Sequence, residues 1–293
     1  MALTLKNPEL GIQGIESFEG SKTNMQHTFT DQTAFLQLLK TQQQDLLAEK
    51  TREQFLIVKS VLEAEFPRLA DGATKLPSRL SYHRKTGTLI AKIIPGLYRD
   101  FAVETFRGSI GTQINLMGLR WEMDTSITPT ISIGDWYRVA DCCWSPAGQN
   151  PSLFLEVGLL ESSGRLASTA KGWLEIPGST VQMVVTIDIN KDEARVLITL
   201  WELGTTFAQP PSTRRAATIE IFRLNDKTVV VGDDCYNSPD EEESIPITDL
   251  VLPFEKVVGR PSEEWLERDF RVHKVELEHL AEGIWQRQGF ISA

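Results

Sequence analysis

The sequence predicts an α/β protein in which a central mixed β-sheet is flanked by helices. Two observations carry this prediction. Apolar residues recur with helical spacing over residues 31–66 and 97–119. Short runs rich in β-branched residues, the strongest at 179–189 and 194–203, follow these segments and read as strands. No internal repeat or clear linker interrupts the pattern, so the chain is expected to form one compact unit with helical ends.

The N-terminal part, residues 1–75, is expected to be an arm followed by a helical extension. Residues 1–30 are rich in Gly, Ser, Thr and Asn and resemble a loosely ordered arm. Residues 31–66 fit two amphipathic helices, or one long broken helix, with Asp31 as the N-cap and an end before Pro67.

Residues 76–293 are expected to form the α/β domain, including the C-terminal helix. A hairpin is predicted at 79–94, with the turn signal KTG, and a helix at 97–119. Strands are expected at 128–134, 137–144, 152–159, 179–189, 194–203, 217–224 and 227–233. A helix over 164–174 could be capped by Ser162 or Ser163. Residues 244–259 look extended, and 262–288 look helical.

Composition excludes several classes of protein. The chain is 41% hydrophobic and 24% charged, which is typical of a soluble globular protein, and no apolar run approaches the roughly 18 residues of a spanning helix. The N-terminus has no basic segment followed by an apolar one, so neither a secretory signal nor a membrane partner is expected. The expected location is cytoplasmic or nuclear.

The charge distribution leaves a nucleic-acid partner open. The net charge of -10 argues against a protein that simply coats nucleic acid. Residues 75–107 nevertheless contain seven basic residues and only two acidic ones, whereas much of the acidity lies elsewhere, as in 240–243. A basic face on an acidic protein is therefore one expectation.

The cysteine, histidine and tryptophan residues do not indicate a metal, disulfide or base-stacking site. The three cysteines, Cys142, Cys143 and Cys235, lack metal-binding or disulfide spacing, so buried reduced thiols are expected. His83, His273 and His279 do not cluster in sequence. Core packing is preferred to base stacking for a scattered set of tryptophans: Trp121, Trp136, Trp144, Trp173 and Trp201.

Three acidic positions could form a metal site. Glu156 lies inside the apolar run LFLEVGL, where an ionised carboxylate is costly unless it is paired, hydrogen-bonded or bound to a metal. If the strands around Asp141 and Glu156 pair as a hairpin, the two carboxylates converge near Asp100 or Glu104 of the preceding helix. Such a cluster suits Mg²⁺ or Mn²⁺, which could support phosphodiester hydrolysis. Alternatively, Asp141 begins a turn, and Glu156 pairs with Arg138 or Lys171.

At these residues the chain resembles the restriction-endonuclease-like PD-(D/E)XK superfamily. The order is a helix acid, then VADCCW, FLEVGLLES and AKGWL, followed by two strands, VQMVVTIDI and VLITLWE. It is similar, more closely, to a group of mostly uncharacterised fungal proteins with a GTLI hairpin, a PD.SW.P segment, an EVG.SES strand and a DA.WWL helix. The resemblance covers roughly residues 80–203, with a weaker echo in the C-terminal helix.

The resemblance implies roles for individual residues. Asp141 takes the place of the Asp in the PD motif, with Ala140 where Pro would stand, and Glu156 takes the place of the Glu in E-x-K. Asp100 corresponds to the acid of the core helix. Asp141, Glu156 and Asp100 are therefore the implied metal ligands. Gly158 stands where the family has its catalytic lysine, as it does in the fungal group, and Lys171 could supply a relocated ammonium.

Three functions remain open from the sequence. The first is a Mg²⁺- or Mn²⁺-dependent nuclease acting on DNA, with Asp100, Asp141, Glu156 and Lys171 as the catalytic set. The second is a nuclease fold redeployed on a small-molecule substrate, for example in fungal secondary metabolism. The third is a catalytically silent binding or scaffold protein. The helical segments 31–66 and 263–287 could also serve a homodimer.

Overall fold

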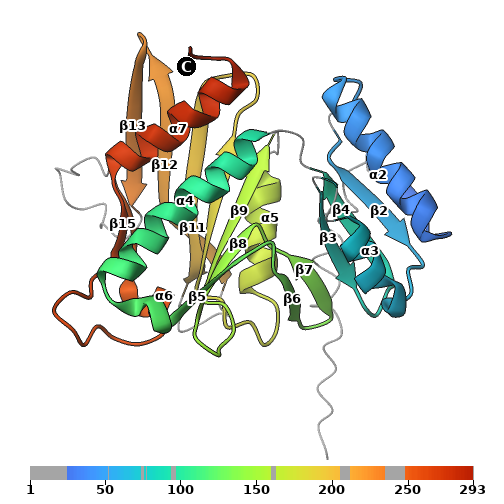
Figure 1. Cartoon of the computed structure of the whole chain (residues 1–293), viewed down its shortest axis with the longest axis horizontal. Coiled ribbons are helices and arrows are strands. Elements are labelled where there is room, and N and C mark those ends of the chain that lie inside the picture. The colour runs from blue at the N-terminus through green and yellow to red at the C-terminus, as the bar shows by residue number, and fades with distance from the viewer. Residues whose placement is uncertain are drawn as a thin grey trace, which may run out of the picture. The chain divides into compact units, whose positions relative to one another are not determined.

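A six-stranded sheet and a seven-stranded sheet organise the chain in the computed structural model (Figure 1). The structure describes residues 25–51, 53–73, 76, 78–93, 97–159, 163–204, 212–234 and 248–292. These residues belong to two compact units. The first takes the chain up to residue 95 together with 130–139 and 176–178, and the second takes the rest. The predicted mixed α/β class, with helices flanking a mixed sheet, is confirmed.

The first unit is a six-stranded sheet with helices on one face. Its strands run in the order β1-β2-β4-β3-β7-β6. Their bounds are β1 Met25–Thr28, β2 Phe55–Lys59, β3 Ser78–His83, β4 Thr88–Ile93, β6 Thr130–Ile133 and β7 Trp136–Val139. The helices α2 (Gln32–Leu47) and α3 (Phe66–Ala73), the latter preceded by the short η1 (Glu63–Glu65), bury their apolar sides against this sheet. The predicted cap is confirmed, because Asp31 accepts a hydrogen bond of 2.9 Å from the N–H of Ala34.

The second helix predicted within residues 31–66 is wrong. Residues 55–59, FLIVK, form β2, which pairs parallel to β1 and antiparallel to β4. A short continuous apolar run does not distinguish a buried strand from a helix, and here two flanking strands supply the hydrogen bonds that make it a strand. Pro67 lies in the first turn of α3, where its missing N–H removes no helical hydrogen bond.

The hairpin β3–β4 belongs to the first unit. Its register, from Ser78 opposite Ile93 to His83 opposite Thr88, follows the predicted KTG turn. Because β4 also pairs with β2, the hairpin extends the sheet of the N-terminal segment. The contact division therefore does not fall at residue 75, and the segment before it contributes strands as well as helices.

The second unit is built on a seven-stranded mixed sheet. Its strands run in the order β13-β12-β11-β10-β9-β8-β5. Their bounds are β5 Met123–Ile127, β8 Cys142–Pro146, β9 Leu153–Leu159, β10 Met183–Ile189, β11 Arg195–Gly204, β12 Ser212–Leu224 and β13 Lys227–Asp234. Among the described residues of this sheet, β9 and β10 form the only parallel pair, and helix α5 (Ser163–Leu174) connects them. The elements α4 (Leu97–Leu116), β8, β9, α5 and β10 follow one another in the order that the sequence predicts, whereas β5 lies at residues that the sequence does not mark as a strand.

Helices cover both faces of this sheet. The helices α4 and α7 (Lys274–Gln288) lie side by side on one face, and α5 lies on the other (Figure 1). All seven residues of β9 are buried, as expected for a strand with packing on both sides. The hydrophobic core on the α4 and α7 side includes Val103, Phe106, Leu155 and Leu280.

The predicted strand at 137–144 is in fact two strands in different sheets. Trp136–Val139 is β7 of the first unit, whereas Cys142–Pro146 is β8 of the second. Ala140 and Asp141 lie between them and are both buried. Sequence patterns report local extension and do not reveal which sheet an extended segment joins.

The C-terminal helix is shorter than predicted. Helix α7 begins at Lys274, and the segment before it contains the two-stranded pair β14 (Leu250–Leu252) and β15 (Phe270–Val272). Residues 254–258, expected to be extended, form the short helix α6 (Phe254–Val258). Within the described residues, no helix combines the length and the apolar character needed to cross a bilayer.

Arg260 forms ion pairs that link the loop after α6 to the segment after α4. Its guanidinium lies 2.9 Å from Glu122 Oε2, just beyond the short η2 (Leu119–Trp121), and 2.9 Å from Glu267 Oε2. Glu267 also accepts N–H hydrogen bonds from Glu263 at 2.6 Å and Glu264 at 3.1 Å. These interactions lower the pKa of Glu267 to about 2, with the Arg260 hydrogen bond as the largest cause.

Acid should therefore weaken the fold through Glu267. A carboxylate whose pKa is depressed in the folded state contributes stability above its unfolded pKa of 4.5, and this contribution is lost as the pH falls towards 2. Urea unfolding at pH 7 and pH 3 should show a larger loss of stability in the wild type than in Glu267→Gln. The exposed Glu263, changed to Gln, is the control. Equal losses in the wild type and Glu267→Gln would contradict the assignment.

Candidate functional site

A buried ion pair occupies the place where the sequence predicts a metal ligand. Asp141 is 1% exposed, and one of its carboxylate oxygens accepts a hydrogen bond from Nη2 of Arg99, which is 6% exposed. Arg99 comes from the first turn of α4, 42 residues earlier in the chain. The carboxylate is therefore already neutralised by a cation of the same unit.

The second oxygen of Asp141 completes the end of a strand. Oδ2 accepts the backbone N–H of Val157 at 2.7 Å. The first paired residue of β8 is Cys142, which lies opposite Leu155 of β9. Asp141 lies one residue before this pair. The Asp141 carboxylate therefore accepts the Val157 N–H in place of a backbone carbonyl of a neighbouring strand. Without it, this N–H would be buried without an acceptor. Both oxygens of Asp141 have structural partners.

Asp100 takes part in the same ion-pair group but lies at the surface. Its side chain is 68% exposed, and Oδ1 lies 2.6 Å from Nη1 of Arg99. Burial opposes the charged form of Arg99, but the interactions with Asp141 and Asp100 outweigh it and raise the pKa of the guanidinium. Glu104, one turn further along α4, pairs with Arg107 at 2.6 Å. The two helix acids therefore bind cations of their own helix.

Glu156 is buried against an indole. It is 5% exposed, and its Oε1 accepts a hydrogen bond of 2.7 Å from Nε1 of Trp173 on α5. The Trp173 ring also stacks on Phe154, with 4.2 Å between the ring centroids. Glu156 thus has a polar partner on the α5 side of the sheet, whereas the cation bound to Asp141 comes from α4.

Gly158, in the position of the family lysine, has no room for a side chain. A Cβ at this position would lie 2.7 Å from Cδ1 and 3.0 Å from Cγ of Leu166. Leu166 is 2% exposed on α5. The helix α5 packs on the backbone of β9 at this point, so a lysine there would have to displace a buried leucine.

Lys171 does not occupy a place from which it could replace the missing lysine. Its Nζ lies 3.5 Å from Glu175 Oε2, and its side chain is 53% exposed. Positions two apart on a helix face different directions, and Trp173 is the residue of this pair that faces the sheet. The relocated ammonium implied by the resemblance therefore points away from Glu156.

Asp188 is an acid near Glu156 that no sequence motif marks. It lies on β10 opposite Gly158, so it shares the face of the sheet that carries Glu156. The parallel pairing of β9 and β10 brings these positions together, and the signal in the sequence was only an acid in the strand VTIDI. No group of three or more His, Cys, Asp or Glu side chains that could hold a metal ion occurs among the described residues.

The residues present do not fit Mg²⁺ or Mn²⁺. These ions need several free oxygen ligands in near-octahedral geometry. Asp141 binds Arg99 and an amide, Glu156 binds an indole, and Asp100 binds Arg99 from the surface. A divalent ion at Asp141 would also lie close to a buried guanidinium, and even two unit charges 4 Å apart repel by about 4 kcal/mol at an effective dielectric constant of 20.

Two cysteines near the ion pair are buried thiols with raised pKa values. Cys142 and Cys143 are free thiols and are buried, as predicted, and Cys235 lies outside the described residues. Burial raises the pKa of Cys142 to about 12 and that of Cys143 to about 11. A thiolate nucleophile is therefore not formed at either position near neutral pH.

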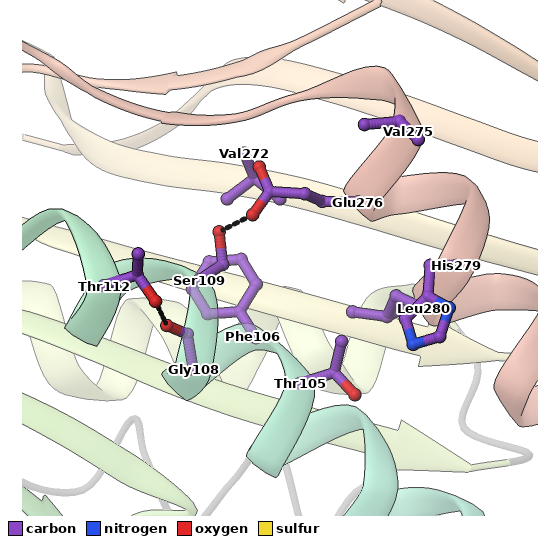
Figure 2. Close-up of a pocket in the computed structure, with 10 residues that line it drawn as sticks. All are labelled: Thr105, Phe106, Gly108, Ser109, Thr112, Val272, Val275, Glu276, His279 and Leu280. Carbon is purple, nitrogen blue, oxygen red and sulfur yellow. Dashed lines mark hydrogen bonds between the residues drawn. The ribbon is translucent and has the colours of Figure 1, made fainter.

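Residues of α4 and α7 line a groove in the second unit (Figure 2). Its volume is about 400 Å³. Ser109 donates a hydrogen bond of 2.7 Å to Glu276, whose other carboxylate oxygen accepts the backbone N–H of His273. The serine is thus bonded to a capping carboxylate and not to an imidazole base, although His279 also lines the groove. The groove lies on the α4 and α7 side, away from the Glu156 side chain.

Comparisons with known proteins add a weak structural likeness. No protein-family model and no curated protein matches the sequence. One similar solved structure is the crystal structure of a candidate nuclease belonging to DUF820 from Anabaena variabilis ATCC 29413, which is 13% identical. The alignment covers 72% of this chain and 97% of that chain, with a TM-score of 0.36. A likeness of this size does not establish a shared site, so the functional argument depends on the contacts described above.

Proposed function

We propose that the protein is a binding protein on a nuclease-like α/β framework, and that its acidic residues stabilise the fold. The observation that carries this proposal is the Arg99 guanidinium bound to the buried carboxylate of Asp141. Three further contacts support it: the N–H of Val157 on Asp141, the Trp173 indole on Glu156, and Leu166 on Gly158.

The alternative function is a divalent-metal-dependent nuclease acting on DNA. It is favoured by one specific feature of the β8–β9 register: its terminal pair, Cys142 and Leu155, adjoins Asp141 in one segment and Glu156 in the other. A metal ion in this site would have to displace Arg99 from Asp141. The small-molecule alternative gains less support, because the groove of about 400 Å³ lies between α4 and α7 and not beside Glu156.

Metal addition separates these functions. We expect millimolar Mg²⁺ or Mn²⁺ to leave the thermal unfolding midpoint unchanged, since a bound ligand would raise it by mass action. We also expect no cleavage of single- or double-stranded DNA or of RNA. Glu156→Ala and Lys171→Ala are the matched variants. Cleavage that depends on Mn²⁺ and disappears in Glu156→Ala would refute the binding-protein proposal.

A further inference from the structure

Large apolar side chains are exposed both near the end of α4 and in the loop after α6. Trp121 is 85% exposed and Trp265 is 88% exposed. Leu116 and Leu266, at 61% and 38%, accompany them. We call these four residues the tryptophan surface. Tryptophan is highly buried on average, and clustered exposed apolar residues mark interaction sites. Core packing, predicted for Trp121 from the sequence, is therefore wrong.

Buried side chains and the ion pairs of Arg260 hold the backbone that carries the tryptophan surface. Leu119 and Met123, on either side of Trp121, are 1% and 5% exposed. Arg260 joins Glu122, the residue after Trp121, to Glu267, two residues after Trp265. The N–H of Arg268 also contacts Met117 Sδ at 3.4 Å. The two segments are thus close together, and their indoles are presented on a fixed base, which reduces the entropy lost on binding.

The charges around the tryptophan surface are mainly acidic. Residues 116–124 and 260–269 contain six acidic and three basic residues. Glu263 and Glu264, next to Trp265, are exposed, and so is Asp124. A net acidic surface repels the phosphates of nucleic acid and attracts a basic partner. An indole face also attracts cations, as the position of the Arg120 guanidinium 5.5 Å from the Trp121 ring centroid illustrates.

We infer that the tryptophan surface docks a basic segment of a partner protein that also carries apolar residues. Cationic side chains of the partner contact Trp265, Glu263 and Glu264, and apolar residues cover Trp121 and Leu116. Tryptophan and arginine are the residue types that most often dominate binding energy at interfaces. This inference names a partner class for the proposed binding function and rests on it.

A synthetic peptide of alternating arginine and leucine is the probe for the full-length protein. Calorimetric titration should detect binding that weakens with salt. We expect Trp265→Ala and Trp121→Ala each to weaken binding by about ten-fold or more, as for central interface anchors. Glu263→Lys combined with Glu264→Lys should weaken it as well. Val275→Ala, which alters an exposed residue in the α4–α7 groove, should not.

Several results would overturn this inference. They are absence of peptide binding, equal binding in the tryptophan variants, and equal affinity for a glutamate–leucine peptide or for single-stranded DNA. A homodimer that Trp265→Ala dissociates would assign the surface to a second copy instead. Circular dichroism melts of every variant exclude unfolding as the cause. Failure here leaves the binding-protein proposal standing, because that proposal is refuted by cleavage sensitive to Glu156→Ala.

Discussion

Replacing Arg99 with methionine is expected to lower the free energy of unfolding by about 3–5 kcal/mol, because the change leaves the Asp141 carboxylate buried without its cation. Asp141 is 1% exposed, so water cannot readily replace the guanidinium. Methionine keeps the unbranched apolar stem of arginine and limits the effect to the lost charge and hydrogen bonds. Equilibrium urea unfolding of the two proteins measures the difference.

Two further variants isolate the cause. Arg107→Met removes a cation from the same helix, but its partner Glu104 is 51% exposed, so the expected cost is only about 0–1 kcal/mol. Asp141→Asn combined with Arg99→Met removes both charges and keeps an oxygen for the Val157 N–H, so it should recover part of the lost stability. A loss below about 1 kcal/mol in Arg99→Met would show that the pair does not stabilise the fold.

Replacing Gly283 with alanine is expected to destabilise the second unit by about 1–3 kcal/mol through overpacking. A Cβ on Gly283 of α7 would lie 2.2 Å from both Cε1 and Cζ of Phe101 on α4. The ring would have to shift together with the guanidinium of Arg287, which lies 3.8 Å from its centroid. The contact between α4 and α7 would have to open, and thermal unfolding should report the loss.

Gly111→Ala is the matched control on the other helix. No atom lies within 4 Å of a Cβ built on Gly111, apart from its chain neighbours and its own helix backbone, so the substitution meets open space. Alanine is about 1 kcal/mol better than glycine inside a helix, so this variant should be as stable as the wild type or slightly more stable. If Gly283→Ala proved as stable as Gly111→Ala, the close approach of Phe101 would be wrong.

Local sequence patterns correctly predicted the helices and strands whose apolar spacing or turn residues are distinctive. The strands β10 and β11, the hairpin β3–β4 and the helix beginning at Leu97 all lie where the alternation of apolar residues, the turn residues or the helical spacing places them. In each case the hydrogen bonds or the packing face follow from neighbours a few residues away. Such patterns are visible without knowledge of the fold.

Patterns failed where distant segments decide the structure. Residues 55–59 have apolar spacing compatible with a helix. Their backbone groups instead form hydrogen bonds with β1 and β4, so the segment is a strand. Residues 262–273 continue the helical pattern of α7, yet β15 pairs with β14 and Arg260 fixes the loop before it. Tertiary pairing overrides weak local preference in both segments.

The sequence by itself determined that Asp141 and Glu156 lie in or beside apolar strands, and in what order their elements follow. Only the tertiary structure decided their use. Asp141 meets Arg99 across 42 residues, Glu156 meets the Trp173 indole across 17, and Leu166 fills the space above Gly158. A buried carboxylate must find a partner, and whether that partner is a metal ion, a guanidinium or an indole depends on which helix the fold brings against the strand.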